Sequence, residues 1–169
     1  MNYAAIRFCD VANGEGVRVS LFVSGCTHCC KGCFNKEAWD FGYGRPFTAE
    51  TESALLEALA PDHIAGLTIL GGEPMEPANQ RVLVPFLRRM RERFGDSRSV
   101  WVYTGCVLET DLEAESRWRT DVTDDFLSMV DVLVDGPFVE DLKDISLRFR
   151  GSSNQRIINM KKRRTENEG

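Results

Sequence analysis

Apolar residues recur along this chain in two patterns. Short runs rich in β-branched and aromatic residues lie at 17–23, 67–70, 99–105 and 130–138, and each predicts a buried strand. Two longer stretches between these runs carry apolar residues at helical spacing. An order in which strands alternate with helices predicts an α/β fold.

The two helical stretches have recognisable ends. Thr48 can cap a helix that runs through Ala60, and Pro61 stops it. The second stretch, 79–94, is followed by a glycine and contains Pro85, so a kink or a late start is predicted there. Helices placed between strands in this way indicate a parallel sheet with helical crossovers.

The predicted strands deliver four loops of interest to one place. In a parallel sheet the carboxyl ends of the strands form the functional edge. Cys26, Gly71, Thr104 and Asp135 each lie at or just after the end of a predicted strand. We therefore expect these four loops to meet at the carboxyl edge of the sheet.

Composition sets outer limits on these predictions. A chain of 169 residues with 43% hydrophobic residues is about the size of one compact domain, which we expect over 1–158, followed by a basic and polar tail, 159–169, that is mobile. The formal net charge of −5 gives no global attraction for nucleic acid or an anionic membrane. The sequence shows no signal-like or membrane-spanning apolar run, so we expect a cytoplasmic protein in which structural disulfides are disfavoured.

Cysteines crowd into one short segment, "GCTHCCKGC". Cys26, Cys30 and Cys33 have the spacing C-x3-C-x2-C, and three thiolates on one loop suit an iron–sulfur cluster. A [4Fe-4S] cluster held by three cysteines has one iron that is free to bind substrate. Spacing alone leaves open the set Cys26, Cys29 and Cys33, as well as a zinc site completed by Cys29 or His28.

A second motif, "GGEP" at 71–74, follows the strand at 67–70. By itself it is also typical of any strand-to-helix turn. Beside a cysteine loop it suggests more, because glycines let the backbone approach a ligand and the carboxylate of Glu73 suits an ammonium group.

Together the two motifs resemble the radical S-adenosylmethionine (SAM) superfamily. The segments "DVANGEGVRVSLFVSGC", "CKGCFNKEAW", "VWVYTG", "VDVLVDGPF" and "RGSSNQRII" are similar to the glycyl-radical enzyme activases within it, in particular those that act on anaerobic ribonucleoside-triphosphate reductase. The resemblance covers most of the chain from Asp10 to Ile158. It implies a partial (β/α) barrel with a mostly parallel sheet.

The resemblance also implies a site. Cys26, Cys30 and Cys33 would ligate a [4Fe-4S] cluster, whose fourth iron would be chelated by the amino and carboxylate groups of SAM. The residues that contact SAM would be Gly71, Gly72 and Glu73 at its amino group and Gly32, Cys33 and Phe34 at its adenosine. Gly32 stands where the superfamily usually has an aromatic residue.

The function implied is reductive cleavage of SAM to methionine and a 5'-deoxyadenosyl radical, which abstracts hydrogen from a glycine of the reductase. A low-potential donor such as flavodoxin would supply the electron. The cluster and SAM carry this chemistry, so no catalytic acid–base pair is required. The alternatives are an activase of another glycyl-radical enzyme such as pyruvate formate-lyase, a radical SAM enzyme acting on a small molecule, and an iron–sulfur or zinc module without catalysis.

Overall fold

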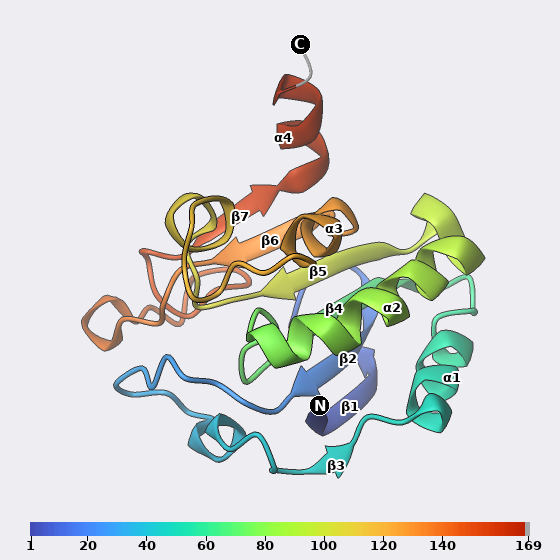
Figure 1. Ribbon diagram of the computed structural model, residues 1–169, viewed down its shortest axis with the longest axis horizontal. Helices are drawn as coiled ribbons and strands as arrows, with labels where there is room; N and C mark the ends of the chain where they lie inside the picture. The colour runs from blue at the N-terminus through green and yellow to red at the C-terminus, as the bar shows by residue number, and fades with distance from the viewer. Residues whose placement is uncertain (168–169) are drawn as a thin grey trace.

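A computed structural model describes residues 1–167 and shows a seven-stranded mixed sheet with helices on one side (Figure 1). The strands are β1 (Asn2–Asp10), β2 (Val17–Val23), β3 (Arg45–Pro46), β4 (Ile64–Gly71), β5 (Ser99–Tyr103), β6 (Val132–Asp135) and β7 (Arg156–Asn159). The α-helices are α1 (Ala49–Ala58), α2 (Pro77–Phe94), α3 (Thr123–Ser128) and α4 (Met160–Asn167). Short helical turns lie at Lys36–Trp39, Gly95–Ser97, Leu108–Glu113 and Glu140–Leu142.

The strand order is β3-β1-β2-β4-β5-β6-β7. The four central strands, β2, β4, β5 and β6, run parallel, whereas β1 and β7 pair antiparallel with the strands beside them. The expected α/β class with a parallel centre is therefore confirmed. A barrel is not confirmed, because the sheet of residues 1–167 does not close and has β3 and β7 at its two edges.

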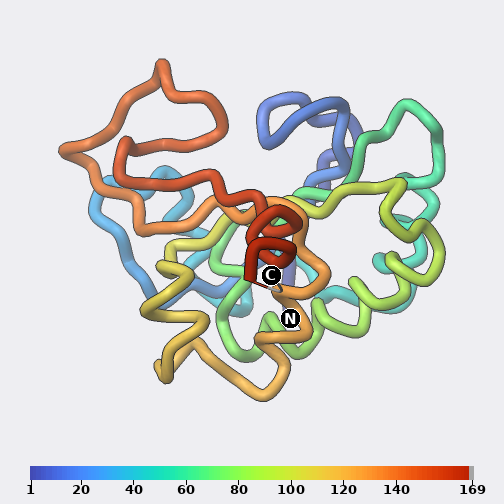
Figure 2. Tube along the Cα trace, turned by 90° about the horizontal axis from the view of Figure 1, so that it is seen from above, coloured from blue at the N-terminus to red at the C-terminus, as the bar shows by residue number. Residues whose placement is uncertain are grey.

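The two faces of the sheet are covered differently. Val19, Leu21 and Val23 of β2 point into an apolar core that α1 and α2 complete, whereas the alternate residues Arg18 and Phe22 lie on the opposite face. That opposite face is covered by loops: the ring of Phe149, from the segment after β6, packs against Trp101 of β5 at 5.4 Å. Figure 2 shows α2 and α3 on one side of the sheet and the loops around 11–16 and 137–155 on the other.

The predicted helices are present. Thr48 caps α1 through its hydroxyl, which accepts a hydrogen bond from the backbone of Thr51 at 3.3 Å. Helix α2 starts at Pro77, two residues before the predicted start, and continues through Pro85. Its buried face packs on the sheet and includes Leu83, Phe86 and Leu87. The free energy gained by burying these side chains exceeds the cost of the helical hydrogen bond that Pro85 removes.

The predicted C-terminal tail begins at a helix. Met160 is buried, and Arg164 of α4 donates to the carbonyl oxygens of Leu127 (3.2 Å) and Val130 (3.0 Å). Residues 168–169 of the predicted tail lie outside the described residues. Figure 1 shows α4 projecting from the end of β7, and the mobility of the tail stays a prediction.

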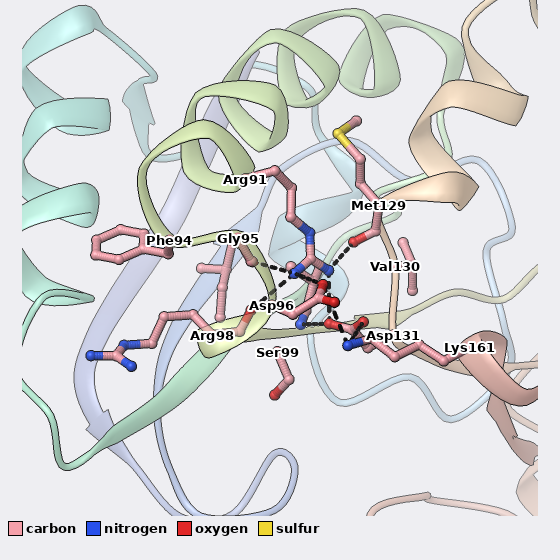
Figure 3. Close-up of polar contacts among 12 residues, drawn as sticks. Arg91, Phe94, Gly95, Asp96, Arg98, Ser99, Met129, Val130, Asp131 and Lys161 are labelled. Atoms are coloured by element: carbon pink, nitrogen blue, oxygen red, sulfur yellow. Dashed lines mark hydrogen bonds and ion pairs between the residues drawn. The ribbon is translucent and has the colours of Figure 1, made fainter.

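A buried ionic cluster ties several elements together at the amino edge of the sheet (Figure 3). Asp131, just before β6, accepts hydrogen bonds from Arg91 of α2 and from the backbone of Val100 of β5, both at 2.7 Å. Lys161 of α4 lies 3.3 Å from its other oxygen. Arg91 in turn donates to the carbonyl of Met129 at 2.6 Å. One carboxylate just before β6 therefore joins α2 and α4 to β5.

Within residues 1–167, the helices are all too short or too polar to cross a bilayer.

Candidate functional site

A cavity lies at the carboxyl edge of the parallel strands, where the sequence places the four loops. Its walls combine residues from the segments that follow β2, β4, β5 and β6, with the ends of those strands as its floor. The lining residues are Phe22, Cys26, His28, Cys30, Cys33, Phe34, Asn35, Trp39, Leu70, Gly71, Gly72, Glu73, Tyr103, Thr104, Gly105, Val134, Gly136, Phe138 and Gln155. In Figure 1 the cysteine loop (blue) and the loop after β6 (orange) gather on the left, toward which β5 and β6 point.

Three cysteines reach this cavity. Cys26, Cys30 and Cys33 line it, whereas Cys29 is exposed and is not among the lining residues. The backbone of Cys29 has φ +52°, a left-handed conformation that turns the chain between Cys26 and Cys30. The geometry therefore favours Cys30 over Cys29 as the middle thiol of the set. Three thiols around one cavity are the donor set that suits an iron–sulfur cluster.

Backbone hydrogen bonds to the segment Lys36–Trp39 hold the start of the cysteine loop. The N–H of Gly25 donates to Ala38 at 2.8 Å, and that of Cys26 donates to Trp39 at 3.2 Å. Inside the loop the N–H of Cys33 donates to the carbonyl of Cys30 at 3.2 Å. The loop therefore has a defined shape that rests on hydrogen bonds within the protein.

Burial controls the protonation of the cavity thiols. It raises the pKa of Cys26 to about 12, and it also raises the pKa of Cys30 above the usual value for a thiol. At neutral pH these two groups are therefore protonated in the metal-free protein. A metal ion that bound these two thiols would have to displace their protons, because the thiolate is the ligand.

Gly72 of GGEP allows the loop after β4 to pack closely against the cysteine loop. A Cβ atom on Gly72 would lie 2.6 Å from the carbonyl oxygen of Gly25 and 2.9 Å from that of Ala38. The N–H of Glu73 donates to the same Gly25 carbonyl at 2.8 Å. Gly72 thus permits a close approach between two backbone segments, in addition to the approach to a ligand that the sequence suggests.

We expect Gly72→Ala to destabilise the protein by about 1–3 kcal/mol, the usual cost of a side chain forced into occupied space. The iron content after anaerobic reconstitution should fall with it, because the clash moves the loop that carries Cys26. Urea unfolding and iron analysis check this. Gly42→Ala is the matched control, since its Cβ would lie no closer than 3.4 Å to a neighbouring side chain. Equal behaviour of the two variants would contradict the prediction.

The carboxylate of Glu73 is buried beneath the cavity, with 1% of the residue exposed. One oxygen accepts from the backbone N–H of Met75 (2.8 Å) and the hydroxyl of Thr104 (2.7 Å). The other accepts from the N–H of Gly105 (2.8 Å) and lies 2.7 Å from Nε2 of His28. Four contacts use the acceptor sites of this carboxylate. Its predicted contact with the ammonium of SAM stays a prediction.

Three further residues that the sequence analysis names lie at different places. Phe34 stands at the rim of the cavity with 97% of the residue exposed. Gly32 is not among the lining residues; its left-handed backbone, φ +76°, turns the outer side of the cysteine loop toward the side chain of Glu140. Asp135 is buried away from the cavity and accepts from Arg156 at 2.9 Å, so it fixes the end of β6.

Sequence reasoning singled out neither Trp118 nor Gly105 and treated His28 as a possible zinc ligand. His28 contacts both of these residues: its ring stacks on Trp118 with centroids 4.4 Å apart, and a Cβ on Gly105 would come within 2.8 Å of the same ring. The position of His28 between two predicted cluster ligands was the only signal in the sequence. Trp118 carried none, because the segment 106–122 shows no pattern that places it near the cysteines.

Comparison with known proteins adds two findings. The model of the 4Fe-4S single cluster domain family matches residues 12–158, which include the cysteine loop, GGEP and the cavity. A match of this extent covers most of the chain.

Relatives match over nearly their full length. A protein of Pasteurella multocida is 44% identical over 159 residues, covering 93% of this chain and 96% of the relative. A Haemophilus influenzae protein is 41% identical (95% and 99% covered), and one of Escherichia coli K12 is 39% identical (95% and 100% covered). Each of these relatives is named an anaerobic ribonucleoside-triphosphate reductase-activating protein.

Proposed function

Since the chain belongs to the 4Fe-4S single cluster domain family and to the family of anaerobic ribonucleoside-triphosphate reductase-activating proteins, we propose that it installs the glycyl radical of such a reductase. The observation that carries the proposal is the cavity in which Cys26, Cys30 and Cys33 face the GGEP segment. When bound there and reduced, the cluster supplies the electron that cleaves the carbon–sulfur bond of SAM.

We assign the cluster to Cys26, Cys30 and Cys33. These three thiols share the cavity, and all three are partly buried. Exclusion of water by the cavity walls would protect a reactive cluster and the radical that follows. Among the residues that line the cavity, only these three are cysteines, so a four-iron cluster held here would keep one iron without a protein thiolate.

We assign the amino group of SAM to the segment Gly71, Gly72 and Glu73. Gly71 and Gly72 line the cavity without side chains, so a ligand can reach their backbone directly. Because the Glu73 carboxylate is already used by four protein contacts, we assign the ammonium to backbone carbonyl groups of this segment. Cys33, together with Phe34 at the rim of the cavity, takes the adenosine. Gly32 acts only through the turn that it allows.

We place the docking surface for the reductase on the face of the sheet that the loops cover. Figure 2 shows α2 and α3 on one side of the sheet and the segment 137–155 on the other. Gly136, Phe138 and Gln155, in or beside this segment, line the cavity. A glycine-bearing loop of the reductase can enter from this side, and a low-potential donor such as flavodoxin reduces the cluster. A small-molecule substrate would be better served by a more enclosed pocket.

The test is electron paramagnetic resonance on a mixture of the reconstituted, reduced protein, SAM and the reductase. We expect the doublet of a glycyl radical on the reductase, and none when SAM is left out. If the protein with a loaded cluster cleaved SAM but produced no glycyl radical, the assignment of the reductase as its partner would be wrong. Radical formation on pyruvate formate-lyase instead would favour the alternative activase, and turnover of SAM with a small molecule would favour the other alternative.

A further inference from the structure

The cysteine loop and the GGEP segment are joined by side chains as well as by backbone. His28 and Thr27, both between Cys26 and Cys30, each contact a carboxylate of the segment that follows β4. His28 Nε2 lies 2.7 Å from Glu73, and Thr27 donates to Glu76 through its backbone N–H (2.6 Å) and its hydroxyl (2.7 Å). The loop that carries the cysteines is therefore pinned to the segment that faces them.

Two neighbours restrict the position of the His28 ring. Trp118 stacks on it at an interplanar angle of 16°, and a Cβ on Gly105 would lie 2.8 Å from the ring, so only glycine leaves enough space there. Trp118 is itself anchored, because its carbonyl accepts from the buried amide of Gln80 in α2 at 2.8 Å. A ring held in this way has one orientation, and it presents Nε2 to Glu73.

The other contacts of Glu73 determine what this hydrogen bond can do. Thr104 and Gly105 follow β5, and Met75 follows β4, so the carboxylate already joins two loops at the carboxyl edge. His28 adds the cysteine loop as the third. Glu73 is therefore the common acceptor through which three walls of the cavity are held at a fixed separation.

A metal ion shared by His28, Glu73 and Cys106 is the obvious rival explanation, since their ligand atoms lie within 4.8 Å of one another. The contacts argue against it. Nε2 and the carboxylate oxygen are already at hydrogen-bonding distance, and both oxygens of Glu73 accept from backbone or hydroxyl donors. An ion between them would have to displace these donors and leave them unpaired in a buried place.

We propose that His28 is a positioning residue, which acts through Glu73 to set the distance and angle between the cluster held by the cysteine loop and the SAM held by Gly71, Gly72 and Glu73. The proposal rests on the function proposed above. His28 touches neither reacting atom in this role. It fixes how the two halves of the site face each other.

Two variants separate the two contacts of the His28 side chain, the hydrogen bond to Glu73 and the stacking on Trp118. His28→Phe keeps a ring that can stack on Trp118 but removes the donor to Glu73. His28→Gln keeps an N–H donor but removes the stacked ring. We expect His28→Phe to bind iron like the unaltered protein. It should bind SAM about tenfold more weakly, because without this hydrogen bond the segment that holds SAM is no longer fixed relative to the cysteine loop. The electron paramagnetic resonance spectrum of its reduced cluster on addition of SAM should also differ from that of the unaltered protein. His28→Gln should stay within about threefold of the unaltered protein.

The measurements are iron content, calorimetric titration with SAM, and the spectrum of the reduced cluster with and without SAM. His63→Phe, at an exposed position just before β4, is the control for the same substitution elsewhere. Unchanged SAM affinity and an unchanged spectrum in His28→Phe would overturn the proposal, and so would a parallel loss of iron, which would make His28 a folding residue. If the unaltered protein itself gave no SAM-dependent spectrum, the proposed function would fail, whatever His28 does.

Discussion

Alanine at Cys26, Cys30 or Cys33 is expected to leave the anaerobically reconstituted protein without its cluster, whereas Cys29→Ala should keep most of its iron. The first three residues line one cavity, and Cys29 lies outside it on a left-handed turn. Each lost thiolate removes one of three protein ligands, and two ligands on a loop do not hold a four-iron cluster against water. Iron and sulfide analysis with absorption spectroscopy measures the result.

Folding must be checked in the same variants. The cysteine loop is also held by backbone hydrogen bonds from Gly25 and Cys26, and alanine leaves these intact. The metal-free variants should therefore unfold in urea close to the metal-free parent protein. Loss of the cluster in Cys29→Ala together with its retention in Cys30→Ala would show that the thiols used are Cys26, Cys29 and Cys33.

Asp131→Ala should produce the largest loss of stability at a site remote from the cavity. The substitution removes the partner of Arg91, leaves the N–H of Val100 without its acceptor and frees Lys161 of α4. Breaking a buried ion pair usually costs 3–5 kcal/mol, and Arg91 keeps three carbonyl acceptors, so we expect about 3 kcal/mol. Urea unfolding of the metal-free protein gives the value.

An exposed ion pair provides the control for this prediction. Arg81 and Asp121 lie 2.7 Å apart with both side chains more than half exposed to solvent, so Asp121→Ala should change the unfolding curve little. A loss in Asp131→Ala no larger than in Asp121→Ala would contradict the assigned role. Because Asp131 lies at the amino edge of the sheet, SAM binding by the folded fraction should be unaffected.

The sequence by itself determined the parts of this protein that depend on neighbouring residues. Val17–Val23 is a strand in the pattern and in the structure, and Thr48 caps a helix because its side chain reaches a backbone group three residues away. The cysteine spacing and GGEP sit directly after strands, so the direction of a parallel sheet was enough to bring them to one edge. The order of strands and helices also gave the α/β class.

Strand β1 was not predicted from the sequence, and the reason is physical. Its segment, "NYAAIRFCD", leaves most of its side chains partly or fully exposed, so burial imposes no clear alternation on it. Its strand conformation comes from antiparallel pairing with β2, a contact between segments that no local pattern records. The same holds for β7, which exists as a strand because β6 lies beside it.

Only the tertiary structure decided how the site is held together. His28 and Glu73 are 45 residues apart in the chain, and His28 and Cys106 are 78 apart, so no spacing rule could pair them. The need for glycine at position 72 likewise arises from the carbonyl groups of Gly25 and Ala38, which belong to another loop. Local sequence selects the residue types and the ends of the elements, whereas the close approach of distant loops, and the buried acceptors that it creates, exists only once the sheet has brought those loops to one edge.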